Sequence, residues 1–163
     1  MASDKTNAMR LLEREGIGFE TRSYALPSER GQEQHLDANE VAAAIGLEAE
    51  QTYKTLVARG EPHGVLFAVI AADQSLDLKA LARASGNKRV ALVPLAELTA
   101  LTGYLRGGCT ALAAKRDYPV IVDELVELHE RIAVSAGVRG TQLILAPADY
   151  LRATRAKIAA IGR

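Results

Sequence analysis

Apolar residues recur at helical spacing in five stretches of the chain, and residues that favour helix ends flank most of them. Met9 and Leu12 fall on one side of a helical pattern, and Gly16 stands where a left-handed terminator is expected. Asp37 with Glu40 forms a capping-box-like start. The pattern predicts helices over about residues 5–15, 37–46, 77–86, 94–101 and 147–155.

Short runs of β-branched and aliphatic residues lie between these helices. They predict strands over residues 19–25, 54–59, 65–72, 88–93, 120–122, 132–135 and 141–145. Every position of the run 65–72 is apolar, which favours a central strand, and GEPHG at 60–64 suits a hairpin loop. Residues 27–34 are polar, contain proline and glycine and lack periodicity, which is typical of a mobile loop.

This order of elements favours an α+β fold with a mixed, mostly antiparallel sheet and flanking helices. A doubly wound parallel sheet would need a crossover helix between successive strands, and the hairpin-rich middle of the chain lacks that alternation. The length of 163 residues fits one compact domain. We therefore expect residues 1–163 to form a single domain.

Composition narrows the possible functions. Lys and Arg total 20, as do Asp and Glu, so no global field draws the protein to DNA or to anionic lipid. The single cysteine excludes a disulfide framework and a cysteine-based zinc site. The N-terminus lacks an apolar signal region, and the longest apolar run, of eight residues, is far below the roughly 20 of a membrane span. We expect a cytoplasmic protein that uses no cofactor and no metal.

The segment TGYLRGGCTAL, residues 102–112, contains the most suggestive chemistry. Gly107 and Gly108 form a tight turn or a nest whose backbone N–H groups bind an anion or an oxyanion. Cys109 is either a nucleophile or a small buried thiol that lines a pocket, and Thr110 is a hydroxyl donor or closes the turn. None of the three histidines is obviously presented to the thiol, which favours the second role for Cys109.

Lys54 is the sharpest single candidate elsewhere. It stands at the head of an otherwise apolar strand, where an ammonium group suits a phosphate or ribose oxygen. The alternative is an edge-strand lysine that blocks the addition of further strands. No persuasive pair of catalytic carboxylates is found, since Asp73, Asp77 and Asp123 have capping or turn explanations.

Basic residues recur through the second half of the chain, at positions 88–89, 106, 115–116, 139, 152, 155 and 157. They form either a solvated, balanced surface or a local phosphate-binding rim, the latter if Arg106, Lys115 and Arg139 gather around one mouth. Seven aromatic residues without tryptophan disfavour an extended base-stacking platform.

Five segments occur in an order that resembles a known family. They are Tyr24 after the first strand, YKTL at 53–56, LDLKALARASG at 76–86, TGYLRGG at 102–108 and VSAGVRG at 134–140. Together they resemble the YbaK-type cysteinyl-tRNA(Pro) deacylases over roughly residues 7–160. These proteins share the fold of the editing domain of bacterial prolyl-tRNA synthetases, and the resemblance implies a sheet that curls into a barrel-like core.

The resemblance also implies an activity and a site. The expected protein is a trans-acting deacylase that hydrolyses the ester of mischarged tRNA, with Cys-tRNA(Pro) as the first substrate and prolyl-tRNA synthetase as a further partner. Lys54 would contact the acceptor end near the terminal adenosine, and the loop Gly107–Ala111 would offer N–H groups to the substrate carbonyl. The thiol of the substrate itself would attack that carbonyl, so that no protein nucleophile is needed.

The matching segments assign the remaining substrate-binding positions, and some of them depart from the family. The assigned residues are Tyr24, Cys109, Thr110, Ala111, Ser135, Gly137, Arg139 and Gln142. Ala111 replaces a usual proline, Cys109 and Thr110 replace an aliphatic residue and serine, and Gln142 replaces an aspartate that could orient the substrate amine. Three hypotheses follow: the cysteinyl deacylase or one of altered specificity, a non-catalytic module that binds aminoacyl-tRNA or a nucleotide, and a hydrolase that uses Cys109.

Overall fold

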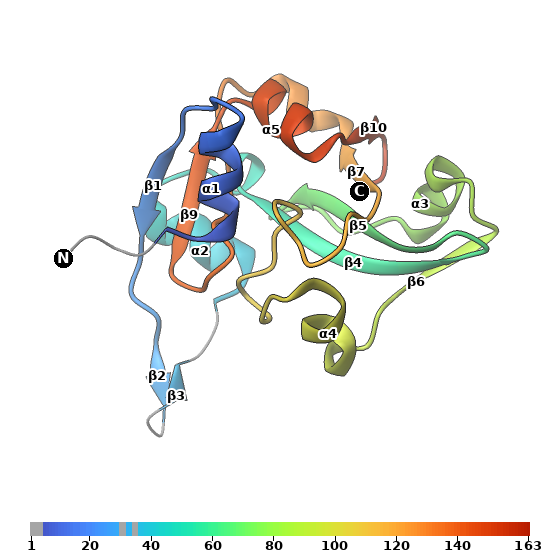
Figure 1. The fold of residues 1–163 in the computed structure, drawn as a ribbon, viewed down its shortest axis with the longest axis horizontal. Helices are drawn as coiled ribbons and strands as arrows, with labels where there is room; N and C mark the ends of the chain where they lie inside the picture. Colours follow the sequence, from blue (N-terminus) through green and yellow to red (C-terminus); the bar gives the residue numbers. More distant parts are fainter. Residues whose placement is uncertain (1–4, 30–31, 34–35) are drawn as a thin grey trace.

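The computed structural model describes residues 5–29, 32–33 and 36–163, and it has the mixed α+β composition that the sequence predicts (Figure 1). The α-helices are α1 Asn7–Arg14, α2 Ala38–Ile45, α3 Leu78–Ser85, α4 Leu98–Thr102 and α5 Pro147–Thr154. The strands are β1 Glu20–Ser23, β2 Ser28–Glu29, β3 Gln32–Glu33, β4 Tyr53–Glu61, β5 Gly64–Ala71, β6 Arg89–Leu92, β7 Val120–Asp123, β8 Ile132–Ser135, β9 Thr141–Leu145 and β10 Lys157–Ala159. Three short 3₁₀ helices, Ala49–Gln51, Leu95–Glu97 and Glu124–Leu128, complete the list.

Helix ends follow the local sequence signals closely. The Asp37 carboxylate accepts a hydrogen bond from the Glu40 N–H, and the Glu40 carboxylate accepts one from the Asp37 N–H. These two bonds form the predicted capping box of α2. Asp77 caps α3 through the Ala80 N–H. Gly46 and Gly86 end α2 and α3 in the left-handed conformation that glycine adopts without strain.

The larger sheet has five strands in the order β10-β7-β5-β4-β6, with β5 in the middle as its apolar sequence predicts. β5 is antiparallel to β4 and parallel to β7, so the sheet is mixed. One face, with Val57, Phe67 and Val69, belongs to the main core, and the other, with Ala58 and Ile70, packs with Leu81 of α3. Two buried faces explain why β5 has no polar alternation.

The smaller sheet has the order β1-β9-β8 and is antiparallel throughout. Among the described residues one parallel bridge, between Thr52 and Ala133, links it to the larger sheet, and the main core includes residues of both sheets. In the described residues the strands form open sheets and no closed barrel, so the barrel-like closure implied by the resemblance is not found.

Several short elements were not foreseen from the sequence. β10 has three residues and gains its place by pairing with β7, and residues 27–34 contain the short hairpin β2–β3 rather than loop alone, with residues 30–31 and 34 outside the described part. The C-terminal segment is held by buried Asp123, which accepts hydrogen bonds from the N–H groups of Ile161 and Gly162. Such long-range contacts leave no periodic signal in the sequence.

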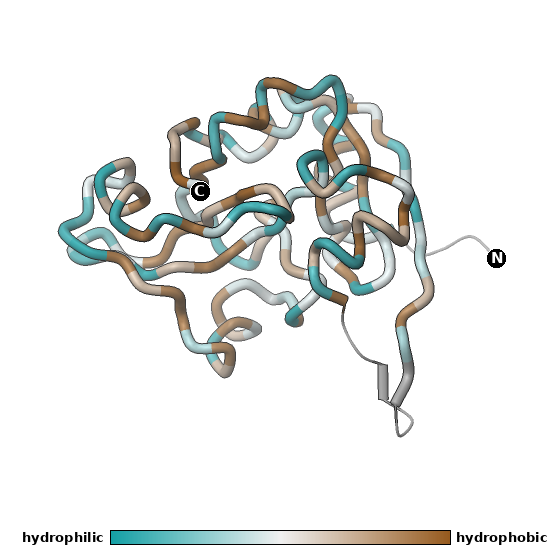
Figure 2. The backbone as a smooth tube through the Cα atoms, turned by 180° about the vertical axis from the view of Figure 1, so that it is seen from behind, coloured by the Kyte–Doolittle hydropathy of each residue, from teal (hydrophilic) through white to brown (hydrophobic). Residues whose placement is uncertain are grey.

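Hydropathy follows this architecture. Figure 2 shows hydrophilic residues at the turn between β4 and β5, and the apolar run of β5 follows this turn. In the part of the chain that the structure describes, no helix has the length and apolar character required to cross a bilayer.

The pairing of β4 leaves a gap that positions the site. On the side opposite to β5, β6 pairs only with Ala58–Glu61, and Thr52 forms its bridge with β8 just before the strand begins. On this side, residues 53–57 of β4 therefore pair with no other strand among the described residues, and they form an open edge between the two sheets. Val57 uses its carbonyl on this side to accept the Val93 N–H. A cavity opens along this edge.

Candidate functional site

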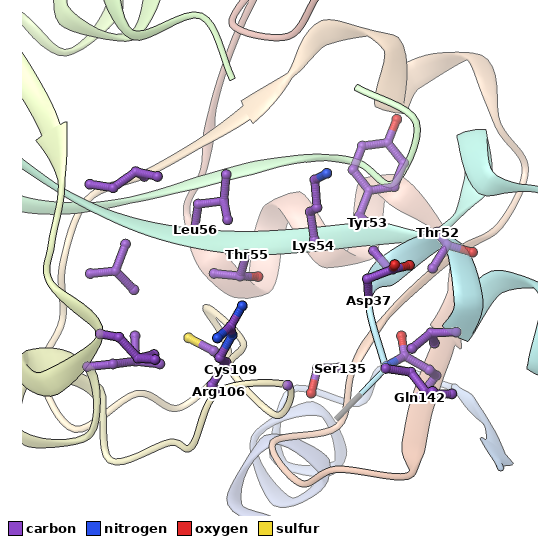
Figure 3. A pocket seen from close by; sticks show the side chains of 18 of the residues that line it. Asp37, Thr52, Tyr53, Lys54, Thr55, Leu56, Arg106, Cys109, Ser135 and Gln142 are labelled. Atoms are coloured by element: carbon purple, nitrogen blue, oxygen red, sulfur yellow. The ribbon is translucent and has the colours of Figure 1, made fainter. Parts of the chain in front are cut away.

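The cavity beside β4, which we call the main pocket, has a volume of about 410 Å³ and draws residues from both sheets (Figure 3). β4 supplies one side, the loop after α4 and the strands β8 and β9 supply further walls, and the start of α2 closes one end. It is lined by Leu36, Asp37, Ala38, Val41, Thr52, Tyr53, Lys54, Thr55, Leu56, Val57, Leu92, Val93, Leu95, Leu98, Arg106, Gly107, Cys109, Ser135 and Gln142. The structure thus brings together five of the eleven residues proposed from sequence.

Lys54 is half-buried in this pocket. Its Nζ donates a hydrogen bond of 3.2 Å to the Ala72 carbonyl at the end of β5, which leaves two ammonium protons for other acceptors. Burial lowers the pKa of Lys54, and the nearby carboxylates of Asp37 and Asp73 act in the opposite direction. A partly desolvated ammonium interacts more strongly with an anionic oxygen than one in open water does.

Asp37 is a pocket residue that sequence reasoning treated only as a helix cap. The cap is real, and the hydrogen bond from the Glu40 N–H is the main reason why the pKa of Asp37 is lowered. The same carboxylate lines the pocket near Lys54 (Figure 3). The capping box alone explains why an aspartate stands at position 37. The sequence therefore holds no sign that Asp37 also lines a pocket.

The two glycines of the pair have different positions and hydrogen bonds. Gly107 lines the pocket with a φ of 88°, and within the described structure its N–H and that of Cys109 make no hydrogen bond. The Gly108 N–H donates to the Leu105 carbonyl at 2.9 Å. The turn thus uses the Gly108 donor internally, and contact of Gly108 with a ligand stays a prediction.

Gly108 instead permits a close contact between two loops. A Cβ at this position would lie 3.1 Å from the Arg139 nitrogen and 3.1 Å from the Val138 carbonyl carbon, so a side chain would push the loops apart. The Arg139 Nε donates to the Arg106 carbonyl at 2.7 Å across the same junction. The segment 137–140 thus packs against the glycine loop and holds it by this hydrogen bond.

Cys109 lines the main pocket as a protonated thiol. Burial raises its pKa to about 12, against which a hydrogen bond with Thr102 acts weakly. No histidine is among the residues that line the pocket in the described structure: His63 lies at the β4–β5 turn and His129 stacks edge-on against Tyr53, while His35 lies outside the described residues. A thiol without a base is a poor nucleophile.

Ser135 and Gln142 face each other across β8 and β9 and supply the polar end of the pocket. The Ser135 Oγ accepts the Gly137 N–H at 3.1 Å. The Gln142 side chain is only 4 % exposed, and its Oε1 has no hydrogen-bond partner in the described structure. A buried amide without a partner is costly for folding, and a ligand donor would satisfy it.

The other proposed residues do not line the main pocket. Thr110 is fully buried and accepts the Leu112 N–H, and Ala111 lines a different cavity on the other side of the loop. Gly137 has a φ of 93°, and a Cβ added at this position would lie 3.0 Å from the Tyr104 ring. None of these three residues lines the main pocket in the described structure, and their contact with a substrate stays a prediction.

Tyr24 and Arg139 also lie outside the main pocket. Tyr24 packs against the small cluster that contains Ile45, and its N–H donates to the Gly140 carbonyl. Arg139 holds the glycine loop as described above. Arg106 does line the pocket whereas Lys115 lies on the other cavity, so these basic residues do not gather at one mouth.

An apolar wall forms the part of the pocket that the sequence did not reveal. Its members are Leu56 and Val57 of β4, Leu92 at the end of β6, and Val93, Leu95 and Leu98 from the segment that leads into α4. Leu92 and Leu95 are 50 % and 57 % exposed, so this wall continues onto the surface. Exposed leucines beside a cavity indicate an apolar ligand surface, but in the sequence they were indistinguishable from core positions.

The described residues contain no group of three or more histidine, cysteine, aspartate or glutamate side chains arranged to hold a metal ion. The pocket instead combines backbone donors, one desolvated ammonium, an unsatisfied amide and an apolar wall. Such a site binds and orients a ligand and stabilises negative charge on an oxygen.

Comparisons with known proteins agree with this chemistry. Residues 32–153 match the family model of the aminoacyl-tRNA editing domain. EbsC of Enterococcus faecalis, named for an inferred Cys-tRNA(Pro)/Cys-tRNA(Cys) deacylase activity, is 42 % identical over 157 residues, which cover 96 % of this chain and 93 % of EbsC. The multifunctional Ser/Thr-tRNA deacylase ProXp-y of Escherichia coli K12 is 34 % identical over 116 residues, 69 % of this chain and 70 % of that protein.

A solved structure shows the same arrangement of elements. The crystal structure of a candidate trans-editing enzyme for prolyl tRNA synthetase superposes with a TM-score of 0.81, at 25 % identity and with 99 % of each chain covered. The family model spans most of the chain, including β4, the glycine loop and Gln142, and the first relative covers nearly all of it. The chain therefore belongs to the aminoacyl-tRNA editing domain family.

Proposed function

We propose that this protein is a trans-acting aminoacyl-tRNA deacylase whose first substrate is Cys-tRNA(Pro). Family membership and the named deacylase relatives support ester hydrolysis of mischarged tRNA as the general activity. The observation that carries the proposal is the main pocket itself, in which binding groups converge but no protein nucleophile is paired with a base. We further propose that residues 1–163 act as one editing domain in the cytoplasm and that prolyl-tRNA synthetase is a partner.

The proposed arrangement of the substrate uses the two chemical ends of the pocket. The N–H groups of Gly107 and Cys109 would donate to the ester carbonyl, and the Gln142 Oε1 would accept from the substrate amine. The Lys54 ammonium would contact a ribose or phosphate oxygen of the terminal nucleotide. The terminal adenine would lie against the apolar wall of Leu92 and Leu95.

The proposed reaction needs no protein nucleophile. The substrate's Sγ bonds to its own carbonyl carbon, the ester bond to the ribose oxygen breaks, and the thiol proton passes to that oxygen. Water then hydrolyses the cyclic thioester to free cysteine. Holding reacting groups in near-attack geometry lowers barriers by about 7–11 kcal/mol in favourable cases, and each backbone donor to the oxyanion adds about 10²–10³ in rate.

The test is a deacylation assay with tRNA(Pro) charged with cysteine, alanine, serine or 2-aminobutyrate, and with Cys-tRNA(Cys). 2-Aminobutyrate is a matched control, because a methyl group replaces the thiol. We expect hydrolysis of Cys-tRNA(Pro) and little hydrolysis of the 2-aminobutyryl ester. Intact Cys-tRNA(Pro) after incubation with folded protein contradicts the proposal, and tight retention without turnover indicates the binding-module hypothesis instead.

A second candidate is a deacylase for serine or threonine esters. The observation that favours it is the 34 % identity to the Ser/Thr-tRNA deacylase ProXp-y. Comparable hydrolysis of seryl-tRNA and cysteinyl-tRNA would support this specificity and would exclude the substrate-thiol mechanism as the only route.

A further inference from the structure

A second cavity, which we call the basic cavity, lies on the other side of the glycine loop. It has a volume of about 420 Å³ and is formed by the loop after the glycine pair together with parts of α1 and α5. Four basic residues line it, Lys115, Arg116, Arg152 and Arg155, against two acidic residues, Glu15 and Asp117. The chain as a whole has no net charge, so this excess is local.

The basic groups are only loosely held. Arg155 and Asp117 lie 3.7 Å apart with side chains 85 % and 89 % exposed, and Arg152 approaches Asp149 at 3.3 Å. Within the described structure Arg116 makes no ion pair, and the Lys115 Nζ donates one hydrogen bond, of 3.4 Å, to the Ala100 carbonyl. Exposed pairs of this kind contribute little to stability, so an anionic ligand can displace them at low cost.

Backbone conformation gives an independent reason to regard this cavity as functional. Ala113 and Arg155 are the two non-glycine residues with positive φ among the described residues, both at 54°, and both line the basic cavity. Helices α2, α3 and α4 end at a left-handed glycine, whereas α5 ends at Arg155. Non-glycine residues held in the left-handed region are strained, and such residues cluster at ligand sites.

The two cavities share one wall. Cys109 lines the main pocket and Ala111 lines the basic cavity, so their Cα atoms are at most about 7 Å apart along the chain. The geometry points to a phosphate-binding site: the basic cavity binds backbone phosphates of the tRNA acceptor strand while the aminoacylated end occupies the main pocket. This inference rests on the proposed function, because it identifies the polyanion as the substrate of the neighbouring site.

The test compares the double variant Arg116→Ala/Arg152→Ala with a control that removes the same charge elsewhere. Arg83→Ala/Lys88→Ala is that control, because both residues are exposed and line neither cavity. Deacylation of Cys-tRNA(Pro) should show a KM raised about tenfold at unchanged kcat for the first variant only. The salt dependence of log KM should become shallower by about one for each lost phosphate contact.

A substrate without phosphates separates binding from structural damage. Cysteinyl-adenosine occupies the main pocket alone, so its hydrolysis should be equal in wild type and in Arg116→Ala/Arg152→Ala. Equal losses with both substrates, or an unchanged KM for tRNA, would overturn the inference. Binding of uncharged tRNA, followed by fluorescence anisotropy, tests the basic cavity even if no turnover occurs, so that failure of the proposed function remains distinguishable.

Discussion

The main pocket and the basic cavity have nearly equal volumes and share one loop, but the side chains that line them differ in burial and in charge. The main pocket places a half-buried Lys54 and a buried amide, Gln142, beside an apolar wall. The basic cavity presents exposed arginines above a strained backbone. Desolvated groups act at short range on particular atoms, whereas exposed charges act through a field that salt screens.

The contrast gives each region its own kinetic signature. Variants in the main pocket should change kcat or the discrimination among amino acids and should keep most of the salt dependence. Variants in the basic cavity should change the KM for tRNA in a salt-dependent way.

Lys54→Met should lower kcat/KM for Cys-tRNA(Pro) by about a hundredfold, since it removes an oriented charge and keeps most of the aliphatic stem. Its free energy of unfolding should not fall. Burial lowers the pKa of Lys54 below 10.5, so the unfolded chain binds this proton more tightly and the charged residue disfavours folding at neutral pH. Steady-state deacylation and urea unfolding measure the two effects.

The pH dependence of stability provides a control for this variant. Between the lowered pKa and 10.5, the stability contributed by Lys54 in the wild type should rise with pH, and Lys54→Met should lack this rise. Lys79→Met, on the exposed face of α3, should match the wild type in both activity and pH dependence. A loss of folding in Lys54→Met would assign the lysine a structural role.

Gln142→Leu should lower kcat/KM by about tenfold, the value of one hydrogen bond to the substrate amine, and should leave stability equal or higher. The reason is that Oε1 is already unpaired in the free protein. 3-Mercaptopropionyl-tRNA(Pro) has no amine and should be cleaved equally by the variant and the wild type. A persistent tenfold difference with this substrate would show that Gln142 does not contact the amine.

Raising KCl from 50 to 200 mM should raise the wild-type KM for tRNA by about sevenfold for every two phosphate contacts, with little change in kcat. Lys54→Met should retain most of this salt response, because the basic cavity remains intact. A salt-dependent kcat with a constant KM would place the charge effect in the main pocket and break the proposed division.

Cys109→Ala should have the smallest effect on activity, within about twofold, because burial raises the pKa of Cys109 to about 12 and keeps the thiol protonated. Alkylation by iodoacetamide at pH 8 should be about a thousandfold slower in folded than in urea-unfolded protein, following the thiolate fraction. Its rate should rise tenfold per pH unit up to about pH 11. Loss of deacylation in Cys109→Ala would restore the cysteine-hydrolase hypothesis.

Local sequence signals predicted most helices and strands because their causes are local. The capping box at Asp37, the left-handed glycines at 46 and 86 and the apolar run of β5 all formed as expected. The three-residue β10 and the hairpin β2–β3 escaped prediction because pairing, rather than composition, makes them strands.

Most helices and strands and the family follow from the sequence, which also assigned site roles to Lys54, Gly107, Cys109, Ser135 and Gln142. The side of the loop that each residue faces is set by tertiary packing. The fold packs Gly108 against Val138 and places Ala111 at the basic cavity. It also adds the apolar wall of Leu92 and Leu95 to the main pocket. Spacing along the chain encodes neighbours within a helix or strand, whereas the facing of a loop depends on the bridge and packing contacts between the two sheets.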